Sequence, residues 1–187
     1  MIICDDKARV IYYNAGWPGS AHDNRVWRNS QIFQRKEAFF SEREYLLGDS
    51  AFGNSSVMVP AFKKVRGQVS LNFEQEKFNT LLAKVRIKSE HCIGMLKARF
   101  PCLRKMNTFI DGQSKMKRCL DRIACCMVLH NLLINCDEDL PQSFWDEVNQ
   151  QIDWEVANEE DEDPLPIADG DECNRRSQVF NYIIEHL

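Results

Sequence analysis

Two long stretches with helical periodicity in the second half of the chain restrict the fold more than any other feature. The first runs from Glu74 to Phe100 and stops at Pro101, because proline disrupts a helix interior. The second runs from about Ser114 to Asn135 and is apolar enough that we expect it to be mostly buried. Hydrophobic residues make up 44% of the 187 residues, so a packed core is possible and a wholly disordered chain is excluded.

Short β-like runs precede these helices and predict an α/β protein. Residues 9–15 are rich in β-branched and aromatic side chains, and a cluster of turn residues ends this predicted strand. Residues 1–4 read as the end of another strand. Residues 45–47 form a short apolar run before Asp49, which predicts a buried strand with an acid at its tip.

The segments beside these strands contain helix and turn signals. We expect one helix over about residues 24–38, with Asp23 as its N-cap. Residues 50–73 are expected to be irregular, with Pro60 and Gly67 as breakers.

Charge divides the chain into a basic body and an acidic tail. Residues 1–131 hold 22 Lys and Arg against 12 Asp and Glu, whereas residues 132–187 hold 2 against 16, so the net charges are +10 and −14. This asymmetry is typical of nucleic-acid contact combined with a masking segment, but two solvated surfaces fit equally well. We expect a domain over 1–136, an acidic, disordered linker over 137–172 and a short amphipathic helix over 173–187.

Eight cysteines suggest a disulfide framework at first sight, but their pattern argues against one. No Cys-x-x-Cys occurs, most cysteines fall in apolar helical patterns, and no secretory signal or membrane-length apolar run is evident. Reduced core cysteines of an intracellular protein are the better interpretation. Cys126 and His130 lie four apart on one expected helix, but two further zinc ligands with recognisable spacing are missing, which favours structural roles.

Two carboxylates stand out as candidates for chemistry. Asp49 follows an expected strand, and Glu90 lies within an expected helix. Carboxylates from separate elements can converge on hard divalent cations, which activate water for phosphoryl transfer. Spacing alone does not establish this, because such acids are usually a turn residue and part of a solvated face, and Arg86 offers Glu90 a helix ion pair.

Four blocks in fixed order carry a family resemblance. Ala15–Ser30 matches the pattern GWPGSxHDxRVxxxS, and Tyr45–Phe52 looks like yLLGDsgY. Residues 78–100 hold an Arg-x-x-x-Glu-x-x-x-Gly pattern around Glu90, and Leu129–Leu133 reads Leu-His-Asn-Leu-Leu. Together they resemble the PIF/Harbinger superfamily of DDE transposases, which includes host-domesticated relatives similar to the Harbinger-derived nuclease.

The resemblance implies an RNase H-like α/β fold, a mixed central sheet flanked by helices, for the domain over 1–136. In the family, three acids bind two divalent metal ions, Mg²⁺ or Mn²⁺, cut DNA and then join it. Position by position, Asp49 is the second acid and Glu90 the third. The first acid lies on an opening strand with a DGTH-like segment, upstream of the residues present here. We therefore expect the chain to begin in the second strand, with Asp5 and Asp6 not matching the missing position.

DNA is the partner that the resemblance implies, together with a nuclear location. A basic run on and after the Glu90 helix would neutralise phosphates, with an ordinary solvated face as the alternative; its residues are Arg86, Lys88, Lys97, Arg99, Arg104 and Lys105. His22, Asp23 and Arg25 are candidates for positions next to the site. The family's upstream DNA-binding helices are not among these residues, so a separate DNA-binding protein is a possible partner.

Three functions therefore stay open at this point. The first is a piece of a Harbinger-type nuclease whose activity is impaired because the first acid is missing. The second is a domesticated module that binds DNA or a protein without cutting. The third, an unrelated small α/β binding domain, is disfavoured by four ordered blocks.

Overall fold

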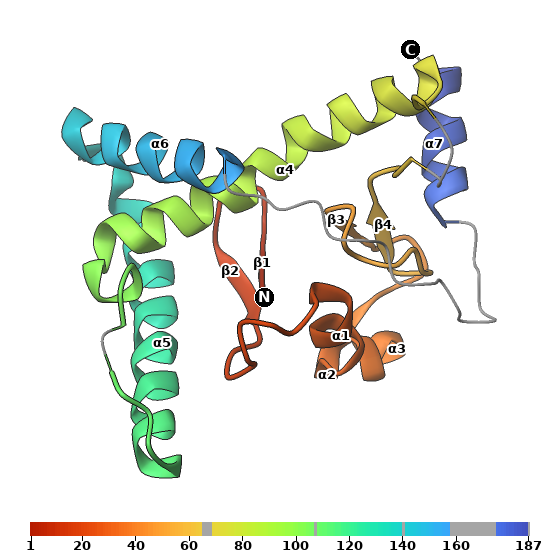
Figure 1. Cartoon of the computed structure of the whole chain (residues 1–187). Coiled ribbons are helices and arrows are strands. Elements are labelled where there is room, and N and C mark those ends of the chain that lie inside the picture. Colours follow the sequence, from red (N-terminus) through yellow and green to blue (C-terminus); the bar gives the residue numbers. More distant parts are fainter. Residues whose placement is uncertain (65–68, 107, 140, 158–174, 187) are drawn as a thin grey trace. The chain divides into compact units, whose positions relative to one another are not determined.

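The computed structural model describes residues 1–64, 69–106, 108–139, 141–157 and 175–186 (Figure 1). The chain forms two compact units. The first unit comprises Met1–Trp17 and Ile87–Glu160, and the second comprises Pro18–Arg86 and Asp161–Leu187. Helix α4, Phe73–Arg99, begins in the second unit and ends in the first.

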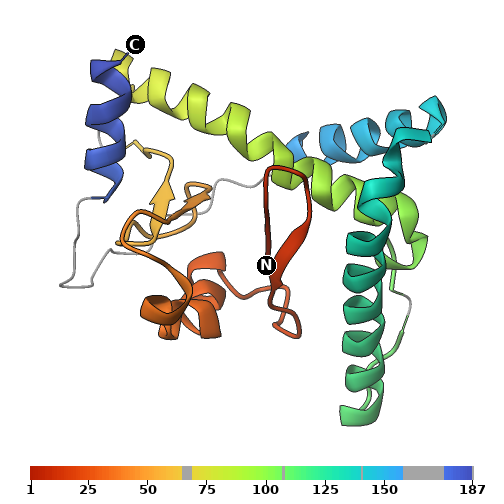
Figure 2. The same cartoon turned by 180° about the vertical axis from the view of Figure 1, so that it is seen from behind.

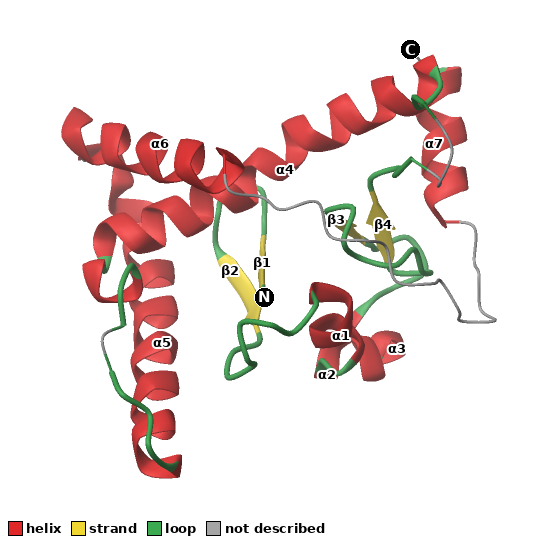
Figure 3. Cartoon of the chain, viewed as in Figure 1, coloured by secondary structure: helices red, strands yellow, loops and turns green. Residues whose placement is uncertain are grey.

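The first unit pairs a β-hairpin with helices (Figure 3). Its further elements are β1 (Ile2–Cys4), β2 (Val10–Tyr13), the 3₁₀ helix η1 (Pro101–Leu103), α5 (Gln113–Leu133), the 3₁₀ helix η2 (Ile134–Asp139) and α6 (Gln142–Ala157). Strands β1 and β2 are antiparallel, with Ile2 opposite Tyr13. Asp5 closes the turn between them, since its Oδ1 accepts hydrogen bonds from the backbone N–H groups of Lys7 and Arg9.

Two side chains of α5 hold the hairpin in place. The Asn131 side-chain amide donates a hydrogen bond to the carbonyl of Val10, and its Oδ1 accepts a hydrogen bond from the N–H of Val10. Both backbone polar groups of this strand residue therefore have a hydrogen-bond partner. His130 is fully buried, and its Nε2 lies 2.9 Å from the carbonyl oxygen of Ala8. Because buried polar groups need partners, these bonds set the register between the hairpin and α5.

The first unit's core contains thiols as well as hydrocarbon side chains. Its buried members are Ala8, Val10, Cys92, Met95, Leu96, Met127 and Val148. All seven described cysteines are free thiols, as predicted, but Cys102, Cys125 and Cys136 are exposed and are not core residues. Burial raises the pKa of Cys126 to about 11, and Cys102 adds to this rise.

Helix α6 lies within the segment 137–172, which the sequence analysis expects to be a disordered linker. Phe144, Trp145 and Val148 of α6 pack on the first unit's core, and α6 lies along the end of α4 in both views (Figures 1 and 2). The acidic composition concealed this apolar stripe, whose burial favours a helix. The rest of the predicted linker beyond α6, residues 158–172, lies outside the described residues.

Helix α5 forms as predicted but is not mostly buried. Cys119, Cys126, Met127 and His130 are buried on one face, whereas several large apolar side chains on the opposite face are exposed. Among the described residues, one helix, Gln113–Cys136, is long and apolar enough to cross a membrane by length and composition, with 22% of its window buried. A core helix with a second apolar face passes the same test.

The second unit contains the parallel strand pair and several short helices. These elements are α1 (Asp23–Arg28), α2 (Gln31–Gln34), α3 (Lys36–Phe39), β3 (Leu46–Gly48), β4 (Met58–Pro60), the first part of α4 and α7 (Arg175–Glu185). The single helix expected over 24–38 is broken into three. Ser30 explains the first break, because its hydroxyl caps α2 by accepting the N–H of Phe33.

An aromatic cluster closes the second unit. The rings of Phe62, Phe78 and Phe180 meet edge to face, with centroids 5.3–5.7 Å apart. Arg176 of α7 stacks over Phe62 at 4.3 Å, and Arg175 donates to the carbonyl oxygens of Ser56 and Glu42. Helix α7 is therefore an integral part of this unit.

The mixed α/β class is confirmed, but the sheets differ from the expected single mixed sheet. In the described residues, β1 pairs with β2 and β3 pairs with β4, as two separate two-stranded sheets. Strand β4 lies in the stretch expected to be irregular. A short buried run there consists of Val57, Met58 and Val59. Because Pro60 was taken as a breaker, the sequence analysis did not predict a strand at this run.

Candidate functional site

Asp49 stands at the carboxyl end of β3, as the sequence predicts. Strand β3 runs parallel to β4, and the chain turns immediately after Gly48. The Oδ1 atom of Asp49 accepts a hydrogen bond from the N–H of Ala51, and its backbone carbonyl accepts the N–H of Phe52 at 3.2 Å. The carboxylate is therefore held by its own turn and is only half-buried, so it stays near solvent.

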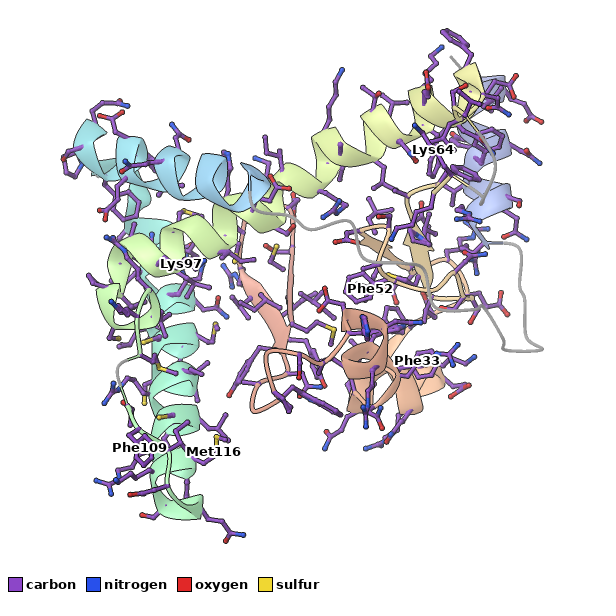
Figure 4. All side chains as sticks on the ribbon, in the orientation of Figure 1. Phe33, Phe52, Lys64, Lys97, Phe109 and Met116 are labelled. Carbon is purple, nitrogen blue, oxygen red and sulfur yellow. The ribbon has the colours of Figure 1, made fainter. Side chains whose placement is uncertain are left out.

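Gly48 is the residue that lets this turn pack closely against the sheet. A Cβ atom at Gly48 would lie 2.6 Å from the sulfur of Met58 and 3.1 Å from the ring of Phe52. Real Cβ atoms essentially never approach other atoms so closely. Figure 4 labels Phe52, the residue that supplies this ring. The position before Asp49 thus requires glycine for reasons of space.

Asn24 links the Ala15–Ser30 block, which contains α1, to the turn that carries Asp49. This side chain is buried, and its Oδ1 accepts the N–H of Gly53 at 3.3 Å. A Cβ atom at Gly53 would lie 3.3 Å from the same oxygen. Sequence reasoning missed Asn24, although its place between Asp23 and Arg25 was a signal. The residue acts as a positioning residue for the loop.

The three candidates around Asn24 are exposed side chains of α1 and its start. Asp23 is the first residue of α1 and not its N-cap, which is His22; no side-chain cap bond is made. The prediction of an Asp23 cap is therefore wrong. A carboxylate in the first turn still stabilises a helix through the helix dipole. Arg25 is exposed on the same helix.

Glu90 lies in the part of α4 that belongs to the first unit. Its side chain is half-buried and takes part in an interaction within the protein, as does that of Arg86. Asp49 belongs to the second unit. That the two carboxylates share a metal ion stays a prediction.

The donor chemistry suits a hard cation, but the number of donors falls short of a two-metal site. Carboxylate oxygens are the ligands that Mg²⁺ prefers. Within the described residues, no group of three or more His, Cys, Asp or Glu side chains is arranged to hold a metal. Of the two acids near the start of the chain, Asp5 and Asp6, Asp5 uses one carboxylate oxygen to accept hydrogen bonds within its own turn. Asp49 and Glu90 would therefore supply only part of the ligands for two metal ions.

Two of the predicted DNA-contact residues have structural partners. The Nη1 atom of Arg99 lies 2.8 Å from Nδ1 of His130, and its guanidinium stacks over the ring of Phe144. Arg104 forms an ion pair with Glu147 and donates to the carbonyl of Lys97. Both arginines therefore stabilise the first unit, a role that the basic run in the sequence did not reveal.

The remaining members of the basic run differ in exposure. Lys88 and Lys105 are exposed, whereas Arg86 and Lys97 are half-buried and interact within the protein; Figure 4 labels Lys97 on α4. The first turns of α5 present further exposed cations that sequence reasoning passed over, namely Lys117, Arg118 and Arg122. Their signal was a helix with basic residues recurring every three to four positions.

Comparison with known proteins identifies relatives of this chain. The family described as "DDE superfamily endonuclease" matches residues 1–131. "Putative nuclease HARBI1" of Mus musculus is 24% identical over 145 residues, which cover 75% of this chain and 38% of the relative. The Homo sapiens protein of the same name is 25% identical over 146 residues with the same coverage. "Protein ALP1-like" of Arabidopsis thaliana is 25% identical over 175 residues, or 84% of this chain and 41% of the relative.

These matches cover most of the chain but less than half of each relative's length. No solved structure matches. The family match includes both blocks that hold Asp49 and Glu90, as well as the Leu-His-Asn-Leu-Leu block up to residue 131. The resemblance to Harbinger-type proteins is thereby confirmed, and the chain belongs to the DDE superfamily endonuclease family.

Proposed function

We propose that this protein acts on DNA as a Harbinger-type, divalent-metal-dependent endonuclease in which Asp49 and Glu90 are two of the catalytic carboxylates. The observation that carries the proposal is the family match over residues 1–131, which spans both acids in their blocks. The turn geometry supports it, because Asp49 is fixed at a strand end beside solvent.

In the proposed reaction, Asp49 and Glu90 bind Mg²⁺ or Mn²⁺ through their oxygens. Two such ions would activate water and stabilise the oxygen that leaves the phosphodiester. The protein's own contribution is positioning: Gly48 and Asn24 hold the turn of Asp49, and α4 carries Glu90 on a rigid element. An RNase H-like arrangement with a preceding strand, which carries the first acid of the family, belongs to the same proposal.

Exposed cations are proposed to bind the DNA backbone. We assign this role first to Lys88 and Lys105, and next to Arg86 and Lys97, which are half-buried. Arg99 and Arg104 contribute through the structure that they stabilise. Contacts to phosphates make affinity fall with salt, so binding should weaken steeply as the salt concentration rises. A nuclear location and a separate DNA-binding partner complete the proposal.

A plasmid-nicking assay tests the catalytic part. The 187-residue polypeptide should nick supercoiled DNA weakly or not at all in Mg²⁺ or Mn²⁺, because its residues supply two of the three carboxylates that the family resemblance implies. A longer polypeptide in which a DGTH-like strand is added before residue 1 should cut. Asp49→Asn and Glu90→Gln should each abolish that cleavage.

Matched controls remove the same charges elsewhere. Glu76 lies on the exposed face of α4, and Asp111 is an exposed residue before α5. Glu76→Gln and Asp111→Asn should both leave cleavage unchanged. Robust metal-dependent nicking by the 187-residue polypeptide, lost in Asp49→Asn, would contradict the expected impairment. Cleavage by the longer polypeptide that survives both site substitutions would contradict the assignment of the acids.

A non-catalytic module that binds DNA or a protein is the second candidate. It is favoured by one observation, the absence of a cluster of three or more metal-ligating side chains among the described residues. This candidate predicts salt-dependent DNA binding that does not change when Mg²⁺ is removed. The nuclease proposal predicts that Mg²⁺ removal weakens binding and that Glu90→Gln reproduces this effect.

A further inference from the structure

An aromatic ring stands in solvent just before α5. Phe109 is 81% exposed. The described part of the segment between η1 and α5 runs back along the first half of α5 in both views (Figures 1 and 2). A single exposed ring is common on protein surfaces and indicates nothing by itself, so the charges around it decide what it can bind.

Cations surround this segment. Residues 104–122 hold six Lys and Arg against two Asp, a net charge of +4. Two of the cations have partners within the protein, since Arg104 pairs with Glu147 and Lys115 pairs with Asp111. The other four are exposed: Lys105, Lys117, Arg118 and Arg122. The surface around Phe109 therefore stays positive after its ion pairs are taken into account.

Helix geometry brings two of these arginines to the side of α5 on which Phe109 lies. Figure 4 labels Phe109 and Met116 on opposite sides of the first half of α5. Successive residues of an α-helix turn by about 100°, so Arg118 lies on the side of α5 away from Met116 and therefore on that of Phe109. Arg122 follows one turn later on the same face, about 6 Å along the axis.

This combination fits a nucleic-acid strand whose bases are unpaired. Arginines neutralise phosphates, and an exposed aromatic ring stacks on the face of any base, which is how proteins bind single strands without reading their sequence. Within a duplex, the neighbouring bases cover both faces of each base. The ring of Phe109 can therefore stack only on an unpaired or terminal base, whereas the arginines can contact either form of DNA.

We propose that Phe109, Arg118 and Arg122 form a binding site for single-stranded DNA, in which an unpaired base stacks on the ring and the two guanidinium groups contact phosphates of the same strand. Lys105 and Lys117 flank the site. The inference rests on the proposed action on DNA and names the form of DNA that this surface accepts. It involves neither Asp49, nor Glu90, nor a metal ion.

Fluorescence anisotropy of labelled oligonucleotides tests the stacking step, with the full 187-residue chain and EDTA present. The chain should bind an oligo-dT single strand more tightly than a blunt duplex of the same length. Phe109→Ala should weaken single-strand binding about fivefold or more and change duplex binding less than about twofold, because only unpaired bases stack on the ring. Since Phe109 is exposed, the variant should keep the helical circular dichroism.

Two further variants separate stacking from a general loss of apolar surface. Phe73→Ala, at a 78% exposed phenylalanine on α4, is the matched control and should leave single-strand binding unchanged. Phe109→Trp should retain the affinity, since indole also stacks on bases. The fluorescence that this added tryptophan contributes should be quenched when oligo-dT binds.

The arginines are tested by salt dependence. Arg118→Gln combined with Arg122→Gln should weaken binding of both DNA forms and make the logarithm of the affinity fall less steeply with the logarithm of salt concentration, by about 0.7 per lost phosphate contact on a single strand. Arg35→Gln combined with Arg43→Gln, at two exposed arginines of the second unit, is the matched control and should leave the slope unchanged.

Three results would overturn the inference. These are single-strand binding that Phe109→Ala does not change, an equal loss for single strand and duplex, and tighter binding of oligo-U RNA than of oligo-dT. Binding to phosphatidylserine vesicles that is lost in Phe109→Ala, without binding of oligo-dT, would show that a membrane surface is the occupant and would also overturn it. The nuclease proposal is decided separately by plasmid nicking, because single-strand binding is measured without a metal ion.

Discussion

Different interactions stabilise the interior of each of the two units of this chain. The first unit uses buried polar groups: His130 and Asn131 bind the backbone of the hairpin, and every described cysteine lies in this unit. The second unit uses aromatic rings and stacked arginine, with burial lowering the pKa of the Arg176 guanidinium. Directional hydrogen bonds fix a register, whereas aromatic packing mainly contributes burial.

This difference bears on the two carboxylates, since each unit carries one. Glu90 sits on a long helix that is anchored by the polar core, and Asp49 sits on a turn that depends on close packing. Substitutions in one unit should therefore disturb one acid and leave the fold around the other intact.

Removing the central ring of the aromatic cluster should have the largest effect. Phe78 is 1% exposed, so Phe78→Ala should reduce the free energy of unfolding of the second unit by about 3–5 kcal/mol. Phe73→Ala, on the same helix at a 78% exposed residue, is the control and should change little. Hydrogen exchange resolved by residue would measure this. Equal loss of protection in β1 and β2 would show that the two units unfold as one.

His130→Ala should destabilise the first unit by about 2–3 kcal/mol. The substitution leaves the Ala8 carbonyl and the Arg99 guanidinium without His130, and buried groups that lose a partner cost about 1–3 kcal/mol each. Chemical denaturation would measure the change, with His186→Ala, at an exposed residue just after α7, as the control. Hydrogen exchange resolved by residue would locate the loss of stability. A loss of protection confined to β3 and β4 would contradict the assignment of His130 to the stability of the first unit.

Gly48→Ala should cost about 1–3 kcal/mol, because Met58 and Phe52 must move to admit the methyl group. Thermal denaturation measures the cost. Gly19→Ala, with no atom near its added Cβ, should be almost neutral. If the two variants melt alike, the close packing beneath Asp49 does not stabilise the turn.

The smallest effect concerns the thiols of the first unit. A hydrogen bond from Cys92 lowers the pKa of Cys4, and the same contact together with burial raises the pKa of Cys92. Because the thiolate is the reactive form, Cys4 should react with iodoacetamide faster than Cys92 near pH 8. Peptide mass spectrometry over time would show the order. Faster alkylation of Cys92 would contradict the direction of this shift.

Much of the fold follows from local sequence patterns. Pro101 ends α4 as predicted, and the apolar run before Asp49 is a strand with the acid at its tip. These features depend on neighbouring residues alone. The predicted α/β class follows from the same local patterns.

The failures arise where tertiary contacts outweigh local composition. Charge counts concealed α6, whose three apolar side chains pack on the core, and the break at Ser30 depends on one cap bond. Arg99 looked like a DNA contact because its partner His130 is distant in sequence. The exposure of Val128, Leu129, Leu132 and Leu133 on α5 could not be foreseen either, since periodicity does not say which apolar face of a helix is buried.

The central claim, that Asp49 and Glu90 share a divalent ion, is tested most directly by a double-substitution cycle on Mn²⁺ affinity. Calorimetric titration would compare the unmodified chain with Asp49→Asn, Glu90→Gln and the combined variant. If the carboxylates hold one ion, each single substitution should weaken binding at least about tenfold, and the combined variant should be little weaker than either. Single effects that add in the combined variant, or an affinity that none of the variants changes, would contradict the claim.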